Sequence, residues 1–258
     1  HPNLWGLGSR LNDFWKEDLV QAITMVCMAV YVLHVGLTLI VVPSAILQPR
    51  DWFSIGAPHP AISLLAGATS GAQLWSGHLW TLLSASFVHY GILHIGFNLW
   101  WLQDLGRLAR EVFGPARFAL LFVLTGIVGF LLSDIVSGVP TAGASCSLFG
   151  LLGALATFGW RRGGVVGKRI KDQMIRWIII ATLYALMMGG VNHFGHGGGL
   201  LAGIGLAFVF PRHERQREGR GVQLAALGLL ALTGVSLLAA AIGWFVMSPP
   251  YLPQIAAG

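Results

Sequence analysis

Apolar residues form seven long segments along this chain, joined by shorter polar connections. A helix needs about 20 consecutive apolar residues to cross a bilayer core, and these runs do not alternate as strands of a membrane barrel do. The pattern therefore predicts an all-α, polytopic transmembrane helical bundle. The expected helices cover residues 19–42, 87–103, 118–137, 145–160, 175–190, 195–210 and 222–247.

Composition agrees with a membrane protein, since 55% of the 258 residues are hydrophobic and only 10% are charged. A soluble domain carries about 25% charged residues. The long connection 43–86 contains four prolines and three tryptophans. Prolines interrupt a spanning helix, and tryptophans favour the membrane boundary. We expect this connection to be a partly embedded outer loop.

The basic residues are distributed unevenly among the connections. Thirteen of the 16 Lys and Arg residues lie in loops 104–117, 161–176 and 211–221, and only Arg50 falls on the opposite side. The positive-inside rule then places the N-terminus in the cytoplasm and the C-terminus outside. In this interpretation the basic residues behind the net charge of +6 set the orientation of the helices in the membrane, and they do not indicate nucleic-acid binding.

Three parts of the chain follow from this topology. Residues 1–18 form a cytoplasmic N-terminal segment, and residues 19–210 form a six-helix membrane domain with its outer loop at about 43–86. Residues 211–258 comprise a basic cytoplasmic loop, a seventh helix and a short extracytoplasmic tail, expected to be disordered. We expect the protein in the plasma (inner) membrane of a bacterium.

Polar groups with catalytic potential begin two of the short segments. Ser145 opens the fourth and His196 opens the sixth, and both fall toward the outer half of the bilayer. A serine nucleophile needs a base to accept its proton, and histidine is the usual choice. Each residue alone has a structural explanation, the serine as a helix N-cap and the histidine as an interfacial group. Together they indicate a serine hydrolase that acts inside the membrane.

Further polar residues bear on this hypothesis. His94 and Asn98 share one helical face at the same expected depth and could donate hydrogen bonds to an oxyanion. Cys146 and Ser147 are rival nucleophiles. Asp134 is a candidate third member of a triad, but a Ser-His dyad is the simpler interpretation.

Three motifs in this order resemble those of the rhomboid intramembrane serine proteases. Residues 143–150 read Gly-Ala-Ser-Cys-Ser-Leu-Phe-Gly and resemble the nucleophile motif, and residues 196–203 resemble the motif that carries the base. Residues 89–98 resemble the second-helix motif with two histidines and an asparagine. The resemblance covers roughly residues 74–210, and the seventh helix fits the "6+1" arrangement of that family.

The resemblance implies a role for each matching residue. Ser145 would attack the scissile carbonyl and His196 would act as general base and acid. His94, Asn98 and the Ser145 amide would form the oxyanion hole, and Phe149 would stack on the base. Supporting glycines would allow a tight turn at Gly143 and close helix packing at Gly199 and Gly203.

The matching region departs from the family pattern at three places. Cys146 stands where the family usually has glycine, Thr81 follows Trp80 where arginine is common, and residues 191–195 differ from the usual Asp-Asn-x-Ala segment.

The expected substrates are transmembrane proteins that unwind locally near the outer face, admitted by flexing of segment 186–194 around Gly189-Gly190. The resemblance implies no cofactor, and nothing in the sequence indicates an oligomeric state.

Two other functions are compatible with parts of this pattern. A catalytically inactive rhomboid-like protein would bind and escort transmembrane helices, although such relatives typically lose the serine or the histidine. A transporter or metal-binding protein could use His89, His94, His193 and His196. The absence of a His-Glu-x-x-His motif and the scarcity of carboxylates argue against a metal site.

Overall fold

The computed structural model describes residues 14–15, 18–48, 55–187, 191–210, 213 and 217–257. Regular structure in these residues is helical, as the apolar pattern predicts. The long helices are α2 (Leu19–Val41), α7 (Ile92–Phe113), α8 (Pro115–Val136), α9 (Ser145–Arg162), α10 (Gly164–Met187), α11 (His193–Val209) and α12 (Arg220–Met247). The short ones are α3 (Pro43–Leu47), α4 (Pro60–Leu65), α5 (Gly71–Trp75), α6 (Thr81–Ser84), the 3-10 turn η2 (Ala85–Phe87) and α13 (Leu252–Ala257).

Each of the seven long helices overlaps one of the seven predicted segments, which confirms the all-α fold class. By length and composition, α2, α8 and α12 could each cross a membrane. The segments 81–87 and 92–113, bent by 93° at residues 88–91, would form a fourth crossing if they make one span. That all seven helices cross the bilayer stays a prediction.

Two predicted boundaries were wrong for the same physical reason. Helix α7 continues to Phe113 and α10 begins at Gly164, so much of the predicted loops 104–117 and 161–176 is helical. Hydropathy marks only the apolar part of a helix, whereas backbone hydrogen bonding continues into its charged ends. His89 was also misplaced, because it lies in the link before α7 and not within the helix.

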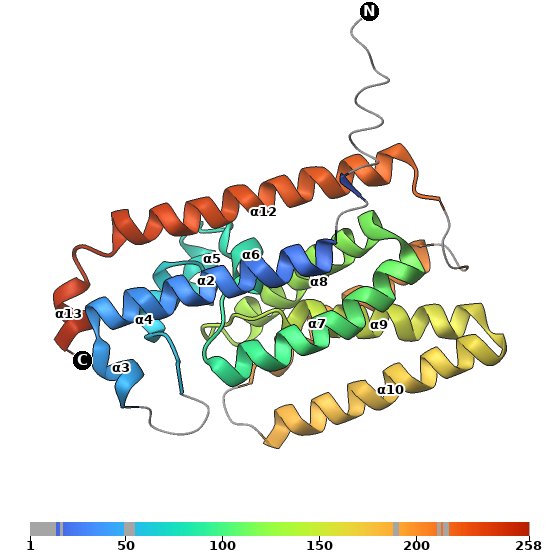
Figure 1. The fold of residues 1–258 in the computed structure, drawn as a ribbon, viewed down its shortest axis with the longest axis horizontal. Coiled ribbons are helices and arrows are strands. Elements are labelled where there is room, and N and C mark those ends of the chain that lie inside the picture. Colours follow the sequence, from blue (N-terminus) through green and yellow to red (C-terminus); the bar gives the residue numbers. More distant parts are fainter. Residues whose placement is uncertain are drawn as a thin grey trace, which may run out of the picture.

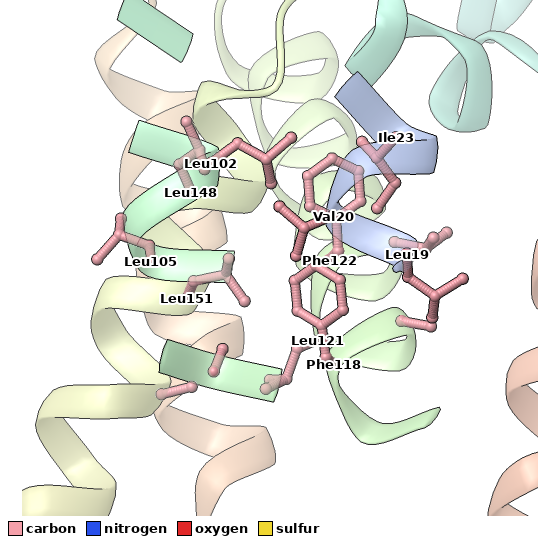
Figure 2. Close-up of a cluster of buried hydrophobic side chains, with 14 of the residues drawn as sticks. Leu19, Val20, Ile23, Leu102, Leu105, Phe118, Leu121, Phe122, Leu148 and Leu151 are labelled. Carbon is pink, nitrogen blue, oxygen red and sulfur yellow. The ribbon is translucent and has the colours of Figure 1, made fainter. Parts of the chain in front are cut away.

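The hydrophobic core lies where α2, α7, α8 and α9 meet (Figure 2). Large side chains from these helices interlock there and are excluded from solvent and lipid. Labelled members of this core are Leu19, Val20, Ile23, Leu102, Leu105, Phe118, Leu121, Phe122, Leu148 and Leu151. Helix α9 is the most enclosed of the four, with 13 of its 18 residues buried. The segment that begins with Ser145 therefore has little freedom to shift.

Helices α10 and α12 lie at opposite edges of the bundle (Figure 1). Helix α12 runs beside α8 and covers the short helices α4 and α6 of the outer connection. The tail after α12 was predicted to be disordered, but it forms α13 and buries Ile255. The prediction was wrong because this short apolar segment packs back against α2.

Candidate active site

Ser145 is the first residue of α9 and is half-buried. The residues before it make a tight turn, in which Gly143 has φ +117°, a conformation that favours glycine. The Gly143 N–H donates to the carbonyl of Ala85 at 2.9 Å, and Thr69 and Thr141 pair through their backbones just upstream. The start of α9 is thus tied to the outer connection, and its first backbone amides have no acceptor within the helix.

His196 lies in the first turn of α11, which packs closely along α9. Glycines make this approach possible. A Cβ atom at Gly199 would overlap the carbonyl of Cys146, and one at Gly203 would overlap the carbonyl of Gly150. The two helices therefore meet backbone to backbone, as small residues permit in membranes. We call this contact the glycine seam.

The glycine seam brings the predicted nucleophile and base together. Ser145 Oγ and His196 Nε2 lie 2.9 Å apart, within hydrogen-bond distance. The ring of Phe149, one turn after Ser145, stacks on the imidazole with centroids 4.3 Å apart and planes 14° apart. Stacking restricts the rotation of His196, so its Nε2 stays directed at the hydroxyl. The arrangement can support proton transfer between the two side chains.

The second-helix residues lie on the other side of the turn before Ser145. His94 Nδ1 accepts the Tyr90 N–H at 3.2 Å, so the neutral ring carries its proton on Nε2. That nitrogen lies against Gly143, where an added Cβ would come within 2.6 Å of it. The buried Asn98 donates through Nδ2 to the His94 carbonyl at 2.7 Å. Two N–H donors thus converge near the start of α9.

The remaining candidates have other partners. Asp134 Oδ2 accepts from Thr69 Oγ1 at 2.5 Å, so this carboxylate is engaged with the outer connection and not with His196. Ser147 Oγ is buried and lies 3.4 Å from Ser86 Oγ. His89 Nδ1 lies 3.2 Å from the Phe87 carbonyl. None of the three side chains contacts the base in the described structure.

Cys146, the departure next to the nucleophile, is also buried and is a free thiol. Its side chain points between α8 and α11, where Gly129 and Gly195 leave room for it. A Cβ at either glycine would come within 3 Å of Cys146 side-chain atoms. The extra bulk at position 146 is therefore housed away from the Ser145 hydroxyl.

Asn192 is a site residue that the sequence analysis did not identify. Its side chain caps α11 by accepting from the Gly195 N–H at 3.2 Å. Its amide donates toward the hydroxyls of Ser133, Ser137 and Thr141, at 2.5, 3.1 and 2.9 Å. Asparagine is a preferred N-cap, so its place before the sixth segment was the available signal. The residue fastens the start of α11 to α8 and to the turn before Ser145.

No group of three or more His, Cys, Asp or Glu side chains in the described part of the chain could hold a metal ion. The site instead comprises a hydroxyl, an imidazole and N–H donors at one end of a helical bundle. The apolar helices indicate an integral membrane protein, and its site has the hydroxyl–imidazole geometry that serine hydrolases use.

Comparison with known proteins gives the family. The Rhomboid domain model matches residues 76–213, more than half of the chain. The chain therefore belongs to the rhomboid family. Rhomboid protease GluP of Bacillus subtilis (strain 168) is 31% identical over 178 residues, which are 69% of this chain and 33% of that protein.

Two other relatives differ in what their names state. Rhomboid-like protease 3 of Toxoplasma gondii is 26% identical over 255 residues, 97% of this chain and 91% of that protein. Inactive RHOMBOID-like protein 8 of Arabidopsis thaliana is 27% identical over 139 residues, 53% of this chain and 40% of that protein. The chain thus spans a third of GluP but most of the Toxoplasma protein. The family contains both proteases and an inactive member.

Proposed function

We propose that this protein is an intramembrane serine endopeptidase that uses a Ser145-His196 dyad. The observation that carries the proposal is the 2.9 Å contact between Ser145 Oγ and His196 Nε2. The pair begins two helices that are locked together by the glycine seam, so the contact is held by backbone packing. The proteases among the relatives add support.

The chemistry follows from this geometry. Ser145 Oγ attacks the scissile carbonyl carbon while His196 Nε2 accepts the hydroxyl proton. His196 returns that proton to the leaving amine when the C–N bond breaks, and it then activates the water that hydrolyses the acyl-enzyme. His94 Nε2–H, the Asn98 amide and the amides at the start of α9 stabilise the negative oxygen.

The substrates we propose are transmembrane proteins, cut near the extracytoplasmic face. Ser145 and the arginines Arg161 and Arg162 lie at opposite ends of α9. The positive-inside rule assigns the arginine end to the cytoplasm, so the hydroxyl faces the other side. A substrate helix must unwind to expose its carbonyls there. Gly189 and Gly190 of the expected admission segment lie outside the described residues.

The test is cleavage of a model transmembrane substrate by the purified full chain in liposomes. We expect Ser145→Ala and His196→Ala each to lower kcat by about 10³-fold or more. A fluorophosphonate probe should label the wild type at Ser145 only. Ser147→Ala and Cys146→Ala are matched controls, because they remove the neighbouring nucleophiles, and they should keep labelling and most activity.

Two outcomes of this experiment would contradict the proposal. An inactive helix-binding protein would neither cleave nor react with the probe, although it would still bind the substrate helix. A nucleophile other than Ser145 would leave cleavage intact in Ser145→Ala and abolish it in Cys146→Ala or Ser147→Ala.

A further inference from the structure

Helix α12 contacts the bundle through a narrow stripe of its surface. The buried residues of α12 are spaced three, four or seven positions apart and are small or polar except for one tryptophan: Ala226, Thr233, Ser236, Ala240 and Trp244. The other side chains of α12 from Arg220 to Val246 are exposed or half-buried. They include large apolar side chains, which are suited to contact with lipid. Two buried hydroxyls in this stripe, Thr233 and Ser236, have different partners.

Thr233 Oγ1 donates within α12 to the carbonyl of Leu229 at 2.9 Å. Ser236 Oγ donates across helices to the carbonyl of Trp80 at 2.5 Å. A buried serine or threonine in a membrane helix commonly donates its hydroxyl to a carbonyl of the preceding turn of the same helix. The Ser236 bond is different, because it joins α12 to a residue 156 positions earlier in the chain.

Trp80 begins the segment that holds the turn before the nucleophile. Its carbonyl also accepts the N–H groups of Leu83 and Ser84 of α6, at 3.0 and 3.1 Å. Helix α6 passes directly into η2, where the Ala85 carbonyl accepts the Gly143 N–H at 2.9 Å. One short rigid segment therefore connects the Ser236 hydroxyl with the turn that contains Gly143.

A second contact from α12 supports the same segment. The methyl group of Ala240 packs under Gly67, where an added Cβ would come within 3.1 Å of it. The Gly67 carbonyl accepts from Ser84 Oγ of α6 at 2.8 Å. Helix α12 lies beside α6 along its C-terminal half (Figure 1). Both contacts therefore position α6 relative to the rest of the bundle.

We propose that Ser236 of the seventh helix is a positioning residue for catalysis, which acts through Trp80 and Ala85 on the Gly143 turn. The inference rests on the proposed protease function. Loss of the hydroxyl frees the start of α6, and the Gly143 turn then shifts relative to His94 and Asn98. Catalysis depends steeply on such geometry, since a displacement of about 1 Å can cost about 10²-fold in rate.

The experiment compares Ser236→Ala with Thr233→Val in the full chain in liposomes. Both changes remove a buried hydroxyl from the same stripe, but only Ser236→Ala removes a bond to α6. We expect Ser236→Ala to lower kcat about ten-fold with KM changed less than about two-fold, because transition-state geometry is affected more than substrate binding. Thr233→Val should keep both constants near those of the wild type.

A second measurement does not depend on activity. Hydrogen–deuterium exchange of the Gly143 amide should become several-fold faster in Ser236→Ala and stay unchanged in Thr233→Val. The comparison is repeated in a Ser145→Ala background, so it is valid even if the chain is not a protease. Unchanged Gly143 exchange in Ser236→Ala would overturn the inference.

The kinetic outcomes separate the two proposals. Wild-type cleavage that stops in Ser145→Ala but continues at the normal kcat in Ser236→Ala supports the protease and overturns the positioning role. An equal loss of kcat in Ser236→Ala and Thr233→Val also overturns that role, because it would reflect general weakening of α12. Cleavage that survives Ser145→Ala overturns the proposed function, and the exchange data then decide on Ser236 alone.

Discussion

Helices α11 and α10 both pack on α9, but they do so in different ways. Helix α11 meets α9 through the glycine seam, where glycines touch the opposing backbone. Helix α10 is near the backbone of α9 at Gly159 and Gly167, next to the turn that joins them. Of the 24 residues of α10, only four are buried.

Aromatic side chains of α10 make further contacts with α7. Trp177 lies edge-on to the rings of Trp100 and Trp101 of α7, with centroids 6.4 and 5.6 Å away. Nearer the C-terminal end of α10, the ring centroid of Tyr184 lies 5.7 Å from that of Phe97 of α7. Aromatic side chains can change rotamer, whereas backbone atoms in contact cannot give way without moving a whole helix. The 2.9 Å Ser145-His196 contact depends on the rigid interface.

The largest expected effect comes from a methyl group inside the glycine seam. Gly203→Ala places a Cβ against the Gly150 carbonyl, so α11 must move away from α9. We expect cleavage to fall about 10²-fold or more and the free energy of unfolding to fall by about 1–3 kcal/mol. Substrate cleavage and thermal unfolding in detergent measure the two effects.

Gly197→Ala is the matched control for this change. Gly197 is on the same helix, but an added Cβ meets nothing within 4 Å. We expect normal activity and equal or slightly higher stability, because alanine favours a helix by about 1 kcal/mol over glycine. Equal activity in Gly203→Ala and Gly197→Ala would show that the glycine seam can accommodate a methyl group. The α9–α11 interface would then be no more rigid than the contacts of α10.

A smaller effect is expected at the start of α11. Asn192→Ala removes the N-cap and the donors to Ser133, Ser137 and Thr141. We expect about 1–2 kcal/mol lower stability and about ten-fold lower kcat, because His196 follows this cap by one turn. Kinetics and thermal unfolding are measured on the same preparation.

Asn192→Asp separates the two functions of this side chain. The carboxylate keeps the acceptor for the Gly195 N–H but cannot donate to the three hydroxyls when ionised. We expect its activity to lie between those of Asn192→Ala and the wild type. Wild-type activity in Asn192→Asp would mean that the links to α8 do not help to place His196.

The smallest expected effect on catalysis comes from α10. Trp177→Ala removes two edge-on ring pairs, each contributing about 0.5–1.5 kcal/mol, so stability should fall by about 1–3 kcal/mol. We do not expect kcat/KM to fall, since the Ser145-His196 pair is held by α11. A loss of kcat/KM as large as that of Gly203→Ala would show that α10 also holds the Ser145-His196 pair in place.

Much of the fold followed from local sequence patterns. The seven apolar segments correspond to the seven long helices, and the three motifs identified the family. Hydropathy does not detect the charged ends of helices, so α7 and α10 are longer than predicted. The hydropathy pattern also missed the bend at His89, because the segments on both sides of this bend form one continuous apolar stretch.

The chain's own residues, taken in order, were enough to indicate a helical membrane protein with Ser145 and His196 each opening a helix, since hydropathy and motif spacing are local properties. The 2.9 Å contact across 51 residues and the bond from Asn192 to Ser133 of α8 depend on how α8, α9 and α11 pack. The Ser236–Trp80 bond likewise exists only because α12 lies against α6. Such contacts join segments far apart in sequence, and no local pattern encodes their distances.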